Sequence, residues 1–119
     1  MRVLVCGGRH YDNRAEVYRR LDFLNSDPAK PVALILHGGA TGADTLADNW
    51  ALERGVPRLS FPVSKQEWRT IGRKAGPLRN KRMLEEGKPD VVVAFPGNTG
   101  TEDMVGRARS KAVPVIDWR

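Results

Sequence analysis

Three glycine clusters, each directly after an apolar run, carry residue types suited to holding a phosphate group. They are Gly7-Gly8-Arg9, Gly38-Gly39-Ala40-Thr41-Gly42 and Gly97-Asn98-Thr99-Gly100-Thr101. Glycine lets the backbone approach a ligand closely, and a helix that begins at such a loop presents unpaired N–H groups to an anion. The hydroxyls of Thr41, Thr99 and Thr101 add further donors. The pattern predicts phosphate binding by these threonines and by the glycines Gly7, Gly8, Gly38, Gly39, Gly42, Gly97 and Gly100.

The standard nucleotide motifs are missing from these loops. No GxxxxGK[ST] sequence occurs, and the first loop, GGRHYD, does not follow GxGxxG. Ordinary use of ATP with magnesium, or of NAD, is therefore disfavoured, and no cofactor is expected. His10 and His37 lack metal-ligand spacing, so no metal is expected either.

Two arginines and an amide accompany the glycine clusters. Arg9 follows the first glycine pair, and Arg79 and Asn80 fall in the expected first turn of a helix, where the helix dipole disfavours a cation. This placement predicts an anion bound by Arg9, Arg79 and Asn80. A salt bridge to Asp44 or Asp12 is the structural alternative.

Three further residues each have two interpretations. Asp44 opens a predicted helix, where it either caps the N-terminus or holds a ribose hydroxyl or an arginine. Tyr11 either stacks on a base or packs in the interior. Cys6, the one cysteine, ends an apolar run and is either a buried hydrophobic residue or a catalytic thiol.

Strands and helices alternate along the whole chain. Strands are predicted at 2–6, 31–36, 58–62, 90–95 and 112–116, and helices at 14–24, 43–54, 77–87 and around 104–108. Asp12 or Asn13 is the expected N-cap of the first helix, Pro77 the first residue of the third, and Pro114 favours an edge position for the last strand. The alternation predicts one domain over 1–119: a doubly wound, Rossmann-like α/β fold with a mainly parallel sheet and helices on both faces. All three glycine loops then lie at the carboxyl edge, where such sheets bind ligands.

Charge and hydropathy limit the classes of partner. The 119 residues carry a net charge of +6. The excess is concentrated between Arg54 and Arg82, where Glu67 is the only acid, so this segment is either a solvated face or a surface for a phosphate-bearing partner. No apolar run approaches the roughly 18 residues of a membrane span, and the start lacks a signal-peptide pattern, so we expect a cytoplasmic protein without membrane contact.

Four sequence blocks together resemble the YspA family of the SLOG superfamily of Rossmann-like proteins. They are GGRHYDN, HGGATGAD, AGPLRNKRM and FPGNTGTEDM. The resemblance implies glycine loops that recognise nucleotides or nucleotide-derived ligands, in proteins proposed as ligand sensors or processing enzymes.

Two related families suggest different activities. PGNTGT resembles the PGGxGTxxE loop of the Lonely guy phosphoribohydrolases, also described as lysine decarboxylase-like, but Met104 stands where their catalytic glutamate belongs and cannot transfer a proton. HGGATGAD resembles the glycine-rich segment of the DNA-processing protein A family, which binds single-stranded DNA.

Our leading hypothesis is a protein that binds a small nucleotide-derived ligand. One alternative is a hydrolase of such a ligand, with Asp44, Glu102 or Asp103 as candidate acid or base. Another is a single-stranded nucleic-acid-binding protein, whose affinity would fall steeply with salt. A homo-oligomer is a further hypothesis, because small Rossmann-like sheets often bury a helical face against a second copy.

Overall fold

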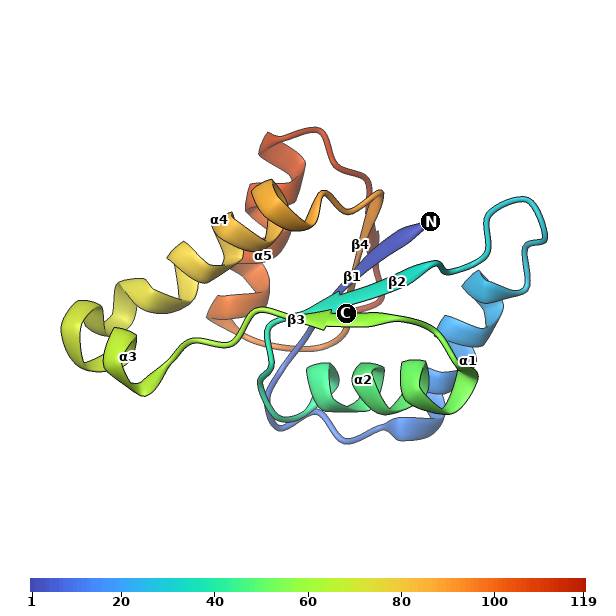
Figure 1. The fold of residues 1–119 in the computed structure, drawn as a ribbon, viewed down its shortest axis with the longest axis horizontal. Helices are drawn as coiled ribbons and strands as arrows, with labels where there is room; N and C mark the ends of the chain where they lie inside the picture. Colours follow the sequence, from blue (N-terminus) through green and yellow to red (C-terminus); the bar gives the residue numbers. More distant parts are fainter.

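A five-stranded, entirely parallel sheet forms the centre of the computed structural model, which describes all residues from 1 to 119 (Figure 1). The strand order is β3-β2-β1-β4-β5. The strands are β1 (Arg2–Cys6), β2 (Leu34–His37), β3 (Arg58–Ser60), β4 (Val91–Ala94) and β5 (Val115–Asp117). The helices are α1 (Arg14–Asn25), α2 (Ala43–Arg54), α3 (Lys65–Ile71), α4 (Ala75–Gly87) and α5 (Thr99–Ser110), and a 3-10 turn, η1 (Gly72–Lys74), joins α3 to α4.

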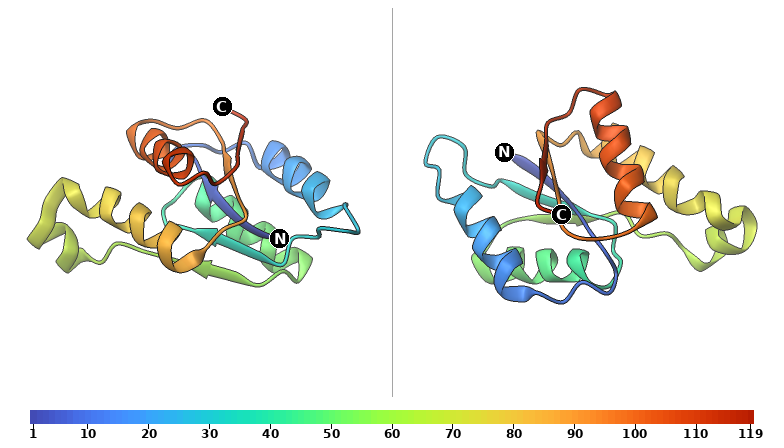
Figure 2. Two further views of the ribbon diagram at one scale, coloured as in Figure 1. Left: turned by 90° about the horizontal axis from the view of Figure 1, so that it is seen from above. Right: turned by 180° about the vertical axis from the view of Figure 1, so that it is seen from behind.

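Helices cover both faces of this sheet. Along β1, Val3 and Val5 point into a cluster with residues of α1 and α2, whereas Leu4 points into a second cluster with residues of α4 and α5. This division follows from the two-residue period of a strand, which sends successive side chains to opposite faces. Figure 2 shows the two helical layers on either side of the strands. The predicted doubly wound, Rossmann-like α/β fold is confirmed.

Helix ends follow the sequence signals in two places. The side chain of Asn13 caps α1 by accepting a hydrogen bond from the N–H of Glu16 at 3.1 Å. Gly55 ends α2 with a φ of 68°, the left-handed conformation that glycine adopts without steric cost. Beyond β4, the strand β5 lies at an edge of the sheet, as Pro114 indicates.

Several predicted strands are longer than those observed. β2 begins only at Leu34, because the N–H of Val32 binds the side chain of Asn25 instead of a neighbouring strand. β3 ends at Ser60, shortly before Pro62, which has no N–H to pair. β5 begins at Val115, because Ala112 has a φ of 58°, outside the extended range.

The helices between β3 and β4 also differ from the prediction. α3 was not predicted, although Ser64 and Glu67 form a capping box at its start. Pro77 was expected to begin the next helix, but α4 begins at Ala75, and Pro77 lies within its first turn, where a missing N–H costs nothing. Figures 1 and 2 show α3 and the start of α4 projecting beyond the sheet as a hairpin of two helices, called here the arm.

None of the helices combines the length and apolarity that crossing a lipid bilayer would require.

Candidate functional site

A cavity of about 300 Å³ opens where the chain changes direction across the sheet, between the carboxyl ends of β1 and β4. From β1 the chain winds outward through β2 to β3, and it then returns to β4 on the other side of β1. This switch point is where open α/β sheets bind their ligands. The cavity is lined by the loop residues after β1, β2 and β4 and by the arm.

The glycine loops at this edge are fixed against one another. The N–H of Gly8 donates to the carbonyl of Pro96 at 2.8 Å, and the Thr41 hydroxyl donates to the carbonyl of Arg9 at 3.0 Å. Gly42 has a φ of 77°, and a Cβ on it would overlap the carbonyl of Gly8 and the backbone of Arg9. A side chain at position 42 would therefore force two walls of the site apart.

Asp44 occupies part of the loop that was expected to hold phosphate. Its Oδ2 accepts hydrogen bonds from the N–H groups of Gly38 at 3.1 Å and Ala40 at 3.2 Å. The N–H of Gly39 donates to Nδ1 of His37 at 3.0 Å. The N–H groups of Gly38 and Gly39, which were predicted to bind phosphate, therefore already have partners within the protein.

The carboxyl group of Asp44 is nevertheless available to the cavity through its other oxygen. Only 7% of Asp44 is exposed, and burial raises its pKa, against the hydrogen bonds from Gly38 and Ala40 and the charge of Arg79. Oδ1 accepts no hydrogen bond from the protein and is not enclosed. Asp44 thus presents a carboxyl oxygen of raised proton affinity to the cavity.

Arg79 joins the arm to the sheet. Its Nη1 donates to the carbonyls of Gly38 at 2.7 Å and Phe61 at 3.3 Å, and its Nε donates to Oδ1 of Asn80 at 3.1 Å. The predicted alternative of a salt bridge is wrong, because the guanidinium forms none. Since α4 begins at Ala75, Arg79 lies in the second turn and the expected conflict with the helix dipole does not arise.

The N-terminus of α5 provides unpaired donors. The N–H groups of Thr99, Gly100 and Thr101 form no hydrogen bond within the protein, and the first bond of the helix runs from the N–H of Glu102 to the carbonyl of Asn98. Thr101 is 4% exposed, and its hydroxyl also has no partner, although it is accessible from the cavity. Four donors therefore converge on one end of the cavity, in the arrangement that binds anions.

The charges around the cavity favour an anion. Arg9 and Arg73 line it and take part in no ion pair, and Arg79 adds a third cation. Asp44 is the only acidic residue among the lining residues. This excess of positive charge attracts a negatively charged ligand.

The structure brings part of the predicted site together at this cavity. The lining includes Gly7, Arg9, Gly38, Asp44, Arg79, Asn80, Thr99, Gly100 and Thr101. Gly8, Gly39, Thr41, Gly42 and Gly97 lie in the surrounding loops but not in the lining. Tyr11 stacks on Phe95 with ring centroids 5.7 Å apart, which is the packing alternative of the prediction.

Two of the three candidate acid or base residues lie elsewhere. Oδ2 of Asp103 accepts hydrogen bonds from Nδ2 of Asn80 at 3.0 Å and Nε of Arg107 at 2.8 Å. Glu102 and Asp103 line a separate hollow of about 490 Å³ along α5. Met104 is buried in the core beneath α5. No group of His, Cys, Asp or Glu side chains is arranged to hold a metal ion.

The sequence prediction missed the contribution of the arm. Trp68 from α3, Arg73 from η1 and Pro77 from α4 all line the cavity. The capping box that starts α3 was the available signal for this helix. On the opposite wall, burial raises the pKa of Cys6 to about 12, so its side chain is a thiol rather than a reactive thiolate.

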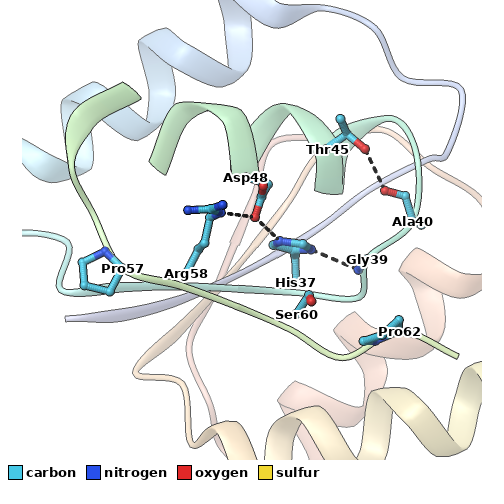
Figure 3. Close-up of a pocket in the computed structure, with 9 residues that line it drawn as sticks. All are labelled: His37, Gly39, Ala40, Thr45, Asp48, Pro57, Arg58, Ser60 and Pro62. Carbon is cyan, nitrogen blue, oxygen red and sulfur yellow. Dashed lines mark hydrogen bonds and ion pairs between the residues drawn. The ribbon is translucent and has the colours of Figure 1, made fainter. Parts of the chain in front are cut away.

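A larger hollow of about 750 Å³ lies on the other side of the loop after β2, beside β3 (Figure 3). Three of its side chains, those of His37, Asp48 and Arg58, are engaged with one another. Oδ1 of Asp48 lies 2.8 Å from Nε2 of His37 and 2.9 Å from Nε of Arg58. Because Nδ1 of His37 already accepts from Gly39, the imidazole has no free nitrogen for chemistry, and the smaller cavity at the switch point is the stronger candidate site.

An open parallel sheet with a cavity at its switch point defines a Rossmann-like α/β protein. Sequence comparison narrows this class: the chain belongs to the YspA, cpYpsA-related SLOG family, whose model matches residues 1–68. It is also 38% identical to the Gene 61 protein of Mycobacterium phage D29, over 98% of this chain and 95% of that protein.

Solved structures with the same fold include two DNA processing proteins. DNA processing protein A (DprA) from Streptococcus pneumoniae superposes with a TM-score of 0.77 at 19% identity, and that from Helicobacter pylori with a TM-score of 0.71 at 18% identity. Both comparisons cover 98% of this chain, which spans only 49% and 64% of those proteins, respectively. The protein TM1055 superposes with a TM-score of 0.69 at 20% identity, over 96% of this chain and 71% of that one.

Proposed function

We propose that this protein binds a nucleotide or nucleotide-derived ligand in the cavity at the switch point, with a phosphate group at the N-terminus of α5. The observation that carries the proposal is the set of four unpaired donors formed by the N–H groups of Thr99, Gly100 and Thr101 and the hydroxyl of Thr101. Phosphate oxygens accept hydrogen bonds from such a helix terminus without further rearrangement. Membership of a SLOG family supports the same ligand class.

The remaining lining residues suit the other parts of such a ligand. Arg9 and Arg73 are free to neutralise phosphate charge, and the open Oδ1 of Asp44 is an acceptor for a sugar hydroxyl. A cavity of about 300 Å³ lies at the lower limit of the roughly 300–1,000 Å³ of ligand pockets, which favours a mononucleotide over a dinucleotide.

The proposal is tested with the variant Thr101→Val, which removes the unpaired hydroxyl and keeps the side-chain shape. Isothermal titration calorimetry would measure binding of AMP and of ribose 5-phosphate. Loss of a hydrogen bond to a charged phosphate predicts affinity about tenfold lower, or weaker still. Thr70→Val, at an exposed threonine outside the cavity, is the matched control.

Two results would contradict this proposal. One is the absence of any binding of phosphate compounds by the wild-type protein. The other is equal affinity in the wild type and Thr101→Val. Mass spectrometry of small molecules released from the denatured protein would show whether a natural ligand co-purifies.

A second candidate function is binding of single-stranded nucleic acid. Its support is a set of cations on the arm and along α4 that form no ion pair: Lys65, Arg69, Arg73, Lys74, Lys81 and Arg82. The similar DNA processing protein A from H. pylori is described with a single-stranded DNA binding mode. This function predicts affinity that grows with strand length and falls steeply with salt, whereas a buried mononucleotide site predicts weak dependence on both.

A third candidate is hydrolysis of the bound ligand with Asp44 as acid or base. Its raised pKa and its open Oδ1 favour proton transfer at higher pH than an ordinary carboxyl group allows. Release of free base or phosphate that is lost in Asp44→Asn would establish this activity. Undiminished turnover in Asp44→Asn would remove Asp44 from the mechanism.

A further inference from the structure

The outer wall of the cavity is formed by a helix that contributes nothing to the core. No residue of α3 is buried, and Trp68 in its middle is 50% exposed. Leaving half of an indole in water forfeits the stabilisation that its burial would give. Trp68 therefore stands out as a large aromatic side chain whose position is not explained by packing.

Trp68 faces the candidate site. It is the only aromatic residue in the lining, and its ring tip lies over Gly76, in the first turn of α4. Pro77 lies beside Gly76 in the same wall. This wall is therefore largely apolar, and it belongs to a different segment of the chain from the anion-binding end formed by residues 98–101.

A cation accompanies the indole. Arg73, from the turn between α3 and α4, lines the same cavity, is exposed and forms no ion pair. An aromatic face beside an unpaired arginine is an arrangement that suits a nucleobase, which stacks on the ring and accepts hydrogen bonds at its edge. A sugar phosphate without a base has no planar π-system that could stack on the indole face.

From this arrangement, and resting on the proposed phosphate site at α5, we infer that Trp68 stacks on the base of the bound nucleotide. The ligand then spans the cavity from the N-terminus of α5 to the arm. The arm is thus the part of the protein that distinguishes a nucleotide from a sugar phosphate. The aromatic base is the chemical group that it recognises.

The test compares AMP with ribose 5-phosphate in the wild type, Trp68→Leu and Trp68→Phe by calorimetry. Base–aromatic stacking predicts that Trp68→Leu binds AMP about 5- to 150-fold more weakly, with unchanged affinity for ribose 5-phosphate. Trp68→Phe, which keeps an aromatic face, is expected to retain most of the AMP affinity. AMP, but not ribose 5-phosphate, should also change the indole fluorescence of the wild type, and this change should be absent in Trp68→Phe.

A matched control is Phe23→Leu, at an aromatic residue of α1 that is 74% exposed and outside the cavity. Because no residue of α3 is buried, Trp68→Leu should retain the wild-type circular dichroism spectrum. Equal affinity of the wild type for AMP and ribose 5-phosphate, or unchanged AMP affinity in Trp68→Leu, would overturn the inference and leave the phosphate site intact. Failure of both ligands to bind the wild type would instead overturn the proposed function on which it rests.

Discussion

Nη1 of Arg79 donates a hydrogen bond of 2.7 Å to the carbonyl of Gly38, a residue that precedes it by 41 positions. The same nitrogen lies 3.3 Å from the carbonyl of Phe61. These bonds connect α4 to the chain segments that follow β2 and β3. They hold the arm against the loop that forms one wall of the cavity.

We expect Arg79→Met to lower the free energy of unfolding by about 1–3 kcal/mol, because it leaves the partly buried carbonyls of Gly38 and Phe61 without their donor. Urea unfolding followed by circular dichroism measures the change. The matched control is Lys81→Met on the same helix, since Lys81 is exposed and forms no ion pair. Equal stability of the two variants would show that the Arg79 bonds do not stabilise the folded state.

Gly42 and Gly55 both have a positive φ, but only Gly42 is surrounded by neighbouring backbone atoms. Both glycines have a positive φ, 77° and 68°, but Gly55 lies in the left-handed helical region, whereas Gly42 has a ψ of −128°, outside that region, and also has neighbours where a Cβ would lie. We expect Gly55→Ala to cost about 1–2 kcal/mol of unfolding free energy. Gly42→Ala should cost more than about 4 kcal/mol or prevent folding, because it also pushes against Gly8.

Thermal and urea unfolding of the two alanine variants would test this difference. A loss at Gly42 no larger than the loss at Gly55 would mean that the loops after β1 and β2 can move apart freely. The conclusion that these glycine loops are fixed against one another would then be wrong.

Cys6 should be nearly inert in the folded protein. Burial raises its pKa from 9.0 to about 12, so at about pH 8 its thiolate fraction is roughly 1,000-fold lower than that of an unperturbed cysteine. Alkylation by iodoacetamide, measured by mass spectrometry, should therefore be slower by about that factor in the native protein than in urea. Since Cys6 is the one cysteine, the signal has a single source. Comparable rates in the two states would indicate an accessible thiolate.

Asp44 should make the folded state less stable as the pH rises. Its pKa is raised by burial above the value of about 3.9 in the unfolded chain, so the folded state binds the proton more tightly. The contribution of Asp44 to the unfolding free energy therefore falls between that value and its folded pKa, and is constant above it.

The variant Asp44→Asn keeps an oxygen that accepts from Gly38 and Ala40 but carries no charge. Its stability relative to the wild type should rise with pH in urea unfolding from about pH 3 to about pH 8. Asp12→Asn, at an exposed position, is the control. A relative stability of Asp44→Asn that is independent of pH would show that burial does not raise this pKa.

The fold was predictable because its signals are local. The apolar runs that end at Cys6 and Phe95 and the helical spacing of Leu46 and Trp50 require only nearby residues to be interpreted. The arm was harder, because Gly72 and Gly76 are poor helix formers, and the structure places a 3-10 turn between two helices there. The capping box at Ser64 was a usable signal for α3, but a helix without buried residues has no apolar period to detect.

The candidate site was predictable only in outline. A grouping of glycine loops at one edge of a parallel sheet was predictable, because each loop follows a strand. Which donors stay free depends on the folded arrangement: the carboxyl group of Asp44 occupies the N–H groups of Gly38 and Ala40, whereas those of Thr99 and Gly100 remain unpaired. It also brought Trp68 to the cavity. Hydrogen bonds and contacts between distant segments depend on how the elements pack, and no local sequence pattern encodes this packing.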